Sequence, residues 1–189
     1  MSWIDPASGG RPPWYVRALL RVLGRKGRPS ESVRQWVRSP RAFLGFLHLY
    51  RALDRGGSPL DAALRSLVMV RVSQSNRCAF CVDLNASRAL DRGVTVAQLD
   101  ALADHASSPL FGPREKAALA FADALVAPGA AVPVDLRRRL RELFPDEALV
   151  ELAALAAFQD MSSRFNAALD VPAEGYCRGA PPAVAPWDP

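Results

Sequence analysis

The stretch that decides the fold covers residues 64–93 and reads LRSLVMVRVSQSNRCAFCVDLNASRALDRG. At its centre, Cys78 and Cys81 form a CxxC pair. Residues three positions apart on a helix share one face, with about 5–6 Å between their Cβ atoms, which is close enough for a disulfide after small adjustments. Asn76 fits the N-cap of the helix that follows. We therefore expect Cys78 in the first helical turn and Cys81 one turn deeper.

This placement predicts that the cysteine thiols are chemically reactive. The N-terminus of a helix carries about half a positive charge, which favours thiolate over thiol. With Arg77 as a neighbouring cation, the helix can lower a cysteine pKa from about 8.5 to near 7 or below. Cys78 gains most from the dipole, and Cys81 is its disulfide partner.

Two other interpretations of the cysteines are structural. Free cysteines often behave as small buried hydrophobes. A zinc site needs four ligands, usually from two close pairs, and the remaining Cys and His residues form no second pair: Cys177, His48 and His105. We therefore expect neither a metal nor a cofactor.

Composition limits the remaining functions. The chain of 189 residues is long enough for one full hydrophobic core, and it has no run of the ~18 apolar residues that a membrane span requires. The net charge of +5 comes from the first 41 residues, whereas the rest holds fifteen basic and seventeen acidic residues. We expect no nucleic-acid binding, and a lone CxxC favours a cytoplasmic redox protein over a secreted disulfide framework.

The chain divides into four segments by composition. Residues 1–12 are rich in Pro, Gly and Ser and indicate a flexible N-terminus, and residues 13–38 form a basic amphipathic arm. Contact of residues 13–26 with an anionic membrane is the alternative to packing on the body or on a neighbouring subunit, and the short length favours packing. The body covers residues 39–172, and a Pro-rich tail covers residues 173–189.

The fold class predicted from these patterns is all-α, with about eight helices joined by short connections. The helix from Pro40 to about Leu53 is apolar nearly all round, so we expect it to be buried, with His48 as a hydrogen-bonded core histidine. Ser58 is expected to cap the next helix, and Cys177 is an incidental residue of the tail.

Residues 67–94, LVMVRVSQSNRCAFCVDLNASRALDRGV, with the Arg71-Val72-Ser73 lead-in and the Asn76-x-Cys78-x-x-Cys81 element, resemble the AhpD-like alkylhydroperoxidase group of the carboxymuconolactone decarboxylase family. The likeness extends more loosely over residues 40–175. It implies an all-α bundle that assembles as trimers or hexamers. It also implies reduction of hydroperoxides or other small oxidants by Cys78 and Cys81, with an external thiol or dithiol as reductant.

The chain departs from the family pattern at the proton relay. Where the peroxidase members of the family carry a glutamate and a histidine, this sequence has Ser66 and Asn85. Neither can act as a base near neutral pH, and general-base help is typically worth 10²–10⁴-fold. The remaining activators, the helix dipole and Arg77, act on Cys78 more than on Cys81. Asn85 is expected to bond a sulfur or a ligand carbonyl, or to fill the space of the histidine.

Three functions follow. The first is a slower or differently tuned thiol-dependent peroxidase or disulfide oxidoreductase. The second is a lyase or isomerase on a small carboxylated lactone, which would depend on His48, Arg71 or Arg164. The third is a non-enzymatic oligomer whose cysteines respond to redox state. For Arg71 and Arg164 the default expectation is an ion pair or a helix-end contact.

Overall fold

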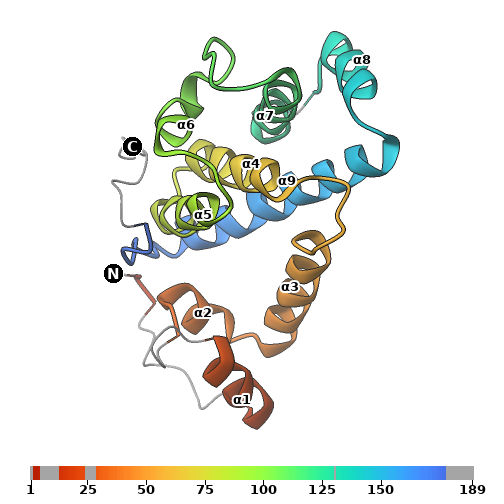
Figure 1. The fold of residues 1–189 in the computed structure, drawn as a ribbon. Coiled ribbons are helices and arrows are strands. Elements are labelled where there is room, and N and C mark those ends of the chain that lie inside the picture. Colours follow the sequence, from red (N-terminus) through yellow and green to blue (C-terminus); the bar gives the residue numbers. More distant parts are fainter. Residues whose placement is uncertain (1, 5–12, 24–28, 130, 178–189) are drawn as a thin grey trace.

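The computed structural model describes residues 2–4, 13–23, 29–129 and 131–177. All regular structure in these ranges is helical, which confirms the all-α prediction (Figure 1). The elements are α1 (Trp14–Leu23), α2 (Glu31–Trp36), α3 (Pro40–Leu53), α4 (Ala62–Ser75), α5 (Ala79–Asp91), α6 (Val96–Asp100), the 3₁₀ turn η1 (Leu102–Asp104), α7 (Pro113–Val126), α8 (Val134–Leu143) and α9 (Asp146–Ala168).

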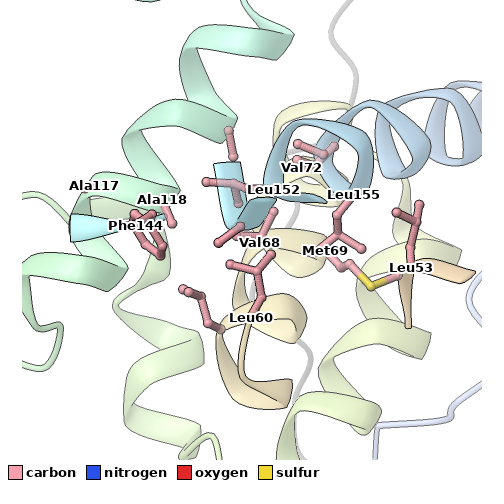
Figure 2. Close-up of a cluster of buried hydrophobic side chains, with 14 of the residues drawn as sticks. Leu53, Leu60, Val68, Met69, Val72, Ala117, Ala118, Phe144, Leu152 and Leu155 are labelled. Atoms are coloured by element: carbon pink, nitrogen blue, oxygen red, sulfur yellow. The ribbon is translucent and has the colours of Figure 1, made fainter. Parts of the chain in front are cut away.

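Helix α4 is the centre of the molecule and packs against α5, α7 and α9. Its apolar residues are buried on nearly every face, because neighbours surround it. Val68 and Val72 meet Leu152 and Leu155 of α9 in the main core (Figure 2). The helix that precedes the CxxC motif is therefore held on several sides by the rest of the fold.

The start of the CxxC helix differs from the prediction. Asn76 is the C-cap of α4, and the N-cap of α5 is Cys78, whose Sγ accepts a hydrogen bond from the Cys81 N–H at 3.2 Å. Between them Arg77 adopts the left-handed conformation with φ 52°, which reverses the chain after α4. The Asn76 amide instead donates to Asp160 and Ser163 of α9. The expected cap position was wrong by two residues.

Helix α3 has the predicted bounds but not the predicted burial. Only Phe43 and Leu53 are buried, whereas Leu44 and Leu49 are 41% and 43% exposed. The helix contacts α2 and α9 but lies at the edge of the fold (Figure 1), so one of its faces is left without neighbours among the described residues. His48 lies on that side and is exposed, so the expectation of a core histidine is wrong.

Side-chain caps mark the starts of three other helices, α2, α4 and α6. Ser30 and Thr95 cap α2 and α6, and Gly93 follows α5 with φ 86°, a conformation that favours glycine. The expected cap of α4 was Ser58, but Asp61 accepts from the Leu64 N–H instead. The hydroxyl of Ser58 donates to Glu151 of α9.

The N-terminal helices pack on the body. Val16 of α1 is fully buried against Val37 and Phe43. Trp36 of α2 stacks between Phe46 and Phe165, with ring centroids 4.7 and 3.9 Å away. The expected flexible N-terminus falls largely on residues 1 and 5–12, and most of the expected tail on residues 178–189; both lie outside the described residues. Within the part of the chain that the structure describes, no helix combines the length and the apolar character needed to cross a membrane.

Candidate active site

A cavity of about 330 Å³ lies between α2 and α3 on one side and α5 and α9 on the other. Most of its wall is apolar and much of it aromatic. The lining side chains are Ser30, Ser32, Val33, Trp36, Phe43, Phe46, Leu47, Tyr50, Arg51, Met69, Phe80, Cys81, Leu84, Asn85, Arg88, Phe158, Gln159, Ser162, Asn166 and Tyr176. The size is at the lower end of the range for sites that hold one small organic molecule.

The two cysteines of the CxxC differ in access. Both are free thiols and nearly buried, Cys78 at 2% and Cys81 at 3% exposed. Cys81 lines the cavity, whereas Cys78 is not part of its wall and packs with Val171 and its neighbours. A small molecule in the cavity therefore meets Cys81 first.

The surroundings of Cys81 disfavour its thiolate. Burial, together with the hydrogen bond and the charge of the neighbouring Cys78, raises the pKa of the Cys81 thiol well above its ordinary value. Hydrogen bonds from Asn166 and Gln159 act in the opposite direction but do not outweigh these effects. Near neutral pH this sulfur is therefore held as a thiol.

Asn166 of α9 is a site residue that the sequence did not predict. Its Nδ2 lies 3.4 Å from the Cys81 Sγ and donates to the Ser162 carbonyl at 3.0 Å. The second contact fixes the orientation of the amide, because an oxygen there would face another oxygen. The Asn166 Oδ1 is then left buried without a partner, and the residue lines the cavity. Asn166 therefore presents an amide N–H to the Cys81 sulfur in the cavity wall.

Asn85 lies one turn beyond Cys81 and is also in the cavity wall. Its Nδ2 donates to the Ser73 hydroxyl at 3.2 Å, and the same hydroxyl accepts from Gln159 at 2.9 Å and donates to the Met69 carbonyl at 2.7 Å. Among the described residues, the sulfur receives its amide hydrogen bonds from α9 and not from Asn85. Asn85 therefore fills the histidine position as part of a polar network.

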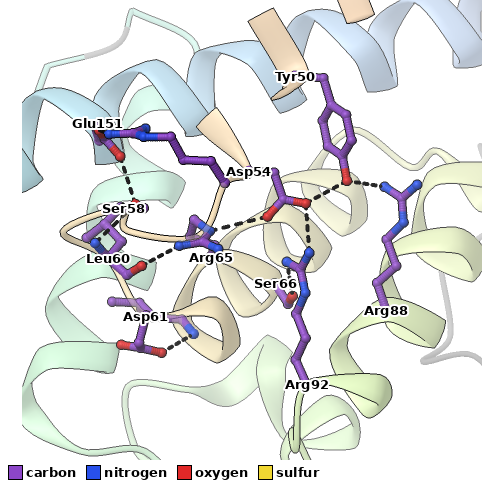
Figure 3. A network of polar contacts seen from close by, with 12 residues as sticks. Tyr50, Asp54, Ser58, Leu60, Asp61, Arg65, Ser66, Arg88, Arg92 and Glu151 are labelled. Atoms are coloured by element: carbon purple, nitrogen blue, oxygen red, sulfur yellow. Dashed lines mark hydrogen bonds and ion pairs between the residues drawn. The ribbon is translucent and has the colours of Figure 1, made fainter. Parts of the chain in front are cut away.

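Ser66 lies outside the cavity wall and accepts a hydrogen bond from Arg92 at 3.1 Å. The same guanidinium donates to Asp54 at 2.7 Å, which is also bonded by Arg65 and by the Tyr50 hydroxyl (Figure 3). Burial opposes ionisation of Asp54, but the hydrogen bonds from Arg92 and Tyr50 outweigh it and lower its pKa to about 2. A carboxylate near the position of the family glutamate is thus present, but it comes from the end of α3.

Tyr50 joins this cluster to the cavity. Its hydroxyl donates to Asp54 at 2.6 Å and accepts from the Arg88 Nη1 at 2.8 Å (Figure 3). Burial raises the pKa of Tyr50 to about 12, and the bond to Asp54 adds to the effect although Arg88 opposes it. The hydroxyl therefore keeps its proton at neutral pH and cannot replace the missing base.

Cys177 was predicted as an incidental tail residue. It belongs instead to residues 174–177, a strap that closes the end of the cavity where the two cysteines lie. The buried carboxylate of Asp83 on α5 accepts three backbone N–H groups, from Glu174, Tyr176 and Cys177, at 2.8–3.0 Å. These bonds hold Tyr176 in the cavity wall and edge-on against Phe80, with 6.1 Å between the ring centroids. Cys177 itself is buried in a hydrophobic cluster.

The other predicted site residues are placed away from the cavity. Arg77 is exposed, and Arg164 pairs along α9 with Asp160. Arg71 pairs with Asp123, which also bonds the buried His105. The structure does not bring Arg71 or Arg164 together with the cavity wall, and His48 is not among its lining residues.

Comparison with known proteins now places the chain. A model of the carboxymuconolactone decarboxylase family matches residues 40–124. The uncharacterized protein YnjA of Escherichia coli K12 is 41% identical over 146 residues, which cover 77% of this chain and 80% of that protein. The chain belongs to the carboxymuconolactone decarboxylase family. The uncharacterized protein YdfG of Bacillus subtilis 168 is another relative, 34% identical over 99 residues that cover 52% of this chain and 67% of that protein.

Solved structures confirm the fold. An uncharacterized peroxidase-related protein from Silicibacter sp. TM1040 superposes with a TM-score of 0.82 over 94% of both chains at 19% identity. The alkylhydroperoxidase AhpD core of a peroxidase-related protein from Ralstonia eutropha JMP134 gives 0.73 over 90% of this chain and 89% of that one, at 24% identity. The AhpD-like helical bundle predicted by resemblance is therefore the fold of this family member.

Proposed function

We propose that this protein is a thiol-dependent oxidoreductase that reduces organic hydroperoxides, with Cys81 as the attacking sulfur and Cys78 as the resolving one. The observation that carries the proposal is the position of Cys81 in the cavity wall, where the Nδ2 of Asn166 lies 3.4 Å from its Sγ. A hydroperoxide R–O–O–H that enters the cavity therefore reaches the Cys81 sulfur before it reaches Cys78. This reverses the order of roles expected from the helix dipole alone.

The cycle balances in two steps. The Cys81 thiolate attacks the terminal oxygen, the O–O bond breaks, and the products are a sulfenic acid on Cys81 and an alkoxide that takes up a proton to become an alcohol. The Cys78 thiol, which neighbours the Cys81 backbone N–H, then attacks the Cys81 sulfur and water leaves as the disulfide forms. An external dithiol is the two-electron reductant that restores both thiols.

The lack of a base in the wall sets the pH dependence. Since the pKa of the Cys81 thiol is raised, the thiolate fraction increases with pH through and beyond about 8.5, the ordinary value for cysteine. We expect the rate of hydroperoxide reduction to rise over this whole range without a plateau at neutral pH. A plateau below pH 7 would contradict the proposed environment of Cys81.

Consumption of cumene hydroperoxide with dithiothreitol as reductant tests the function. Wild-type protein should exceed the rate with dithiothreitol alone, and Cys81→Ser should fall to that background. Cys177→Ser is the matched control, because this third cysteine lies outside the cavity wall, and it should keep the wild-type rate. Equal rates for wild type and Cys81→Ser would remove the proposal.

A further inference from the structure

The charges in the cavity wall are all of one sign. Two arginines, Arg51 and Arg88, contribute to the lining, and none of the lining residues is an aspartate or glutamate. Cationic groups in a cleft with apolar walls produce a positive potential, because the low-dielectric surroundings screen them poorly. The cavity is therefore electrostatically suited to an anion.

Arg88 is the better placed of the two cations. It is half-buried, whereas Arg51 is exposed. Its guanidinium lies 5.2 Å from the ring centroid of Tyr50 and donates one hydrogen bond, to the Tyr50 hydroxyl. A guanidinium has five N–H donors in a planar fork that matches a carboxylate. Among the described residues, most of this binding capacity of Arg88 is left unused.

Asp54, which shares the Tyr50 hydroxyl with Arg88, is already paired with two other arginines. Asp54 forms ion pairs with Arg65 and Arg92 (Figure 3), and within the described part of the chain Arg88 has no ion-pair partner. Holding a cation away from water without a counter-charge is unfavourable. An anionic ligand would supply the missing partner.

Arg88 and Cys81 lie on the same face of α5. Cys81, Asn85 and Arg88 occupy positions i, i+4 and i+7 of α5 and all line the cavity. With a rise of 1.5 Å per residue, the Cα atoms of Cys81 and Arg88 are about 10 Å apart along the helix axis. Aromatic side chains form much of the remaining lining and suit the apolar part of a ligand: Trp36, Phe43, Phe46, Tyr50 and Phe158.

We propose that the cavity binds an amphipathic organic anion, with its carboxylate on Arg88, its apolar body along α5 and its far end at Cys81. Under the proposed function, on which this assignment of the reacting end rests, the substrate is a hydroperoxide that carries a carboxylate at its other end. Arg88 is then a specificity residue, because it selects acidic over neutral hydroperoxides without taking part in the sulfur chemistry.

Binding of unreactive probes tests the site without turnover. The probes are 4-isopropylbenzoate and its neutral isostere 4-isopropylbenzamide, titrated calorimetrically into the reduced protein. Wild type should bind the carboxylate at least tenfold more tightly than the amide, about 1.4 kcal/mol. Arg88→Gln should bring this ratio close to one, Arg88→Lys should retain part of it, and the control Arg141→Gln, on the distant and exposed face of α8, should retain all of it.

Several results would overturn the inference. These are equal affinities of the two probes in wild type, no binding of either, a ratio that persists in Arg88→Gln, or one that disappears only in Arg51→Gln. Thermal unfolding of Arg88→Gln and Arg88→Lys shows that the variants are folded. The peroxide assay with cumene hydroperoxide is independent of these titrations, so a failed function and a failed anion site give different results.

Discussion

The two ends of the cavity are each fixed by a buried carboxylate, and the two carboxylates are satisfied in different ways. At the arginine end, the side chain of Asp54 is 3% exposed and is bonded by two guanidinium groups and a phenol. At the cysteine end, Asp83 is 1% exposed and is bonded by three backbone N–H groups of the strap. Charged side chains therefore stabilise the Asp54 carboxylate, and backbone dipoles stabilise the Asp83 carboxylate.

This difference separates two tasks. The charged cluster joins α3, α4 and α5, so it fixes the helices that form the cavity and leaves Arg88 available to a ligand. The Asp83 contacts join α5 only to the strap, residues 174–177. They therefore hold this segment over Cys78 and Cys81. Loss of the Asp54 cluster should destabilise the fold, whereas loss of the Asp83 contacts should mainly expose the cysteine sulfurs.

The largest effect is expected for Asp54→Asn. This change leaves the buried Arg65 and the partly buried Arg92 without a counter-charge, and breaking a buried ion pair typically costs about 3–5 kcal/mol. Urea unfolding should show a loss of this size, and the control Asp91→Asn, an exposed residue of α5, should lose less than about 0.5 kcal/mol. A small effect of Asp54→Asn would mean that the cluster does not hold the helices together.

Asp83→Ala should have a smaller effect on stability and a larger effect on access. Its three hydrogen bonds are lost, but the freed strap can reach water, so we expect a loss of about 2 kcal/mol. Cys78 and Cys177 should react with iodoacetamide much faster than in wild type. Asp91→Ala is the control on the same helix, and equal labelling rates in all three proteins would show that the strap does not cover the sulfurs.

Asn85→His should restore part of the missing base. The imidazole would stand in the cavity wall one turn from Cys81, and even partial general-base help should raise the rate of hydroperoxide reduction about tenfold at pH 7. The rate should also begin to level off near the ordinary histidine pKa of about 6.5. The pH profile of the initial rate checks this, and a profile like that of wild type would show that the position is out of reach of the sulfur.

The smallest effect is the acid dependence of stability. The pKa of Asp54 is lowered to about 2 in the folded protein, below the value of about 3.9 for an unfolded chain. Its ionisation therefore stabilises the fold fully above about pH 4, and this contribution is lost as the pH falls toward 2. Urea midpoints should fall less between pH 4 and 2.5 in Asp54→Asn than in wild type; equal slopes would contradict the lowered pKa.

The sequence predicted the fold well because its signals are local. The proline position and the apolar pattern predicted the bounds of α3, and the CxxC motif predicted the location of the site. The contacts of the Asn76 amide with α9 and the burial of Cys177 depend on distant segments. The same is true of Asn166 and Asp54, which reach the site from α9 and α3, more than 20 residues away in sequence. No local pattern marks such residues.

Trapping the first oxidised sulfur shows which cysteine attacks the hydroperoxide. Cys78→Ser and Cys81→Ser are each treated with one equivalent of cumene hydroperoxide in the presence of dimedone, which labels sulfenic acids, and the adducts are located by peptide mass spectrometry. The account predicts an adduct on Cys81 in the first variant and no adduct above the peroxide-free control on Cys78 in the second. An adduct that forms on Cys78 as fast as on Cys81 would contradict it.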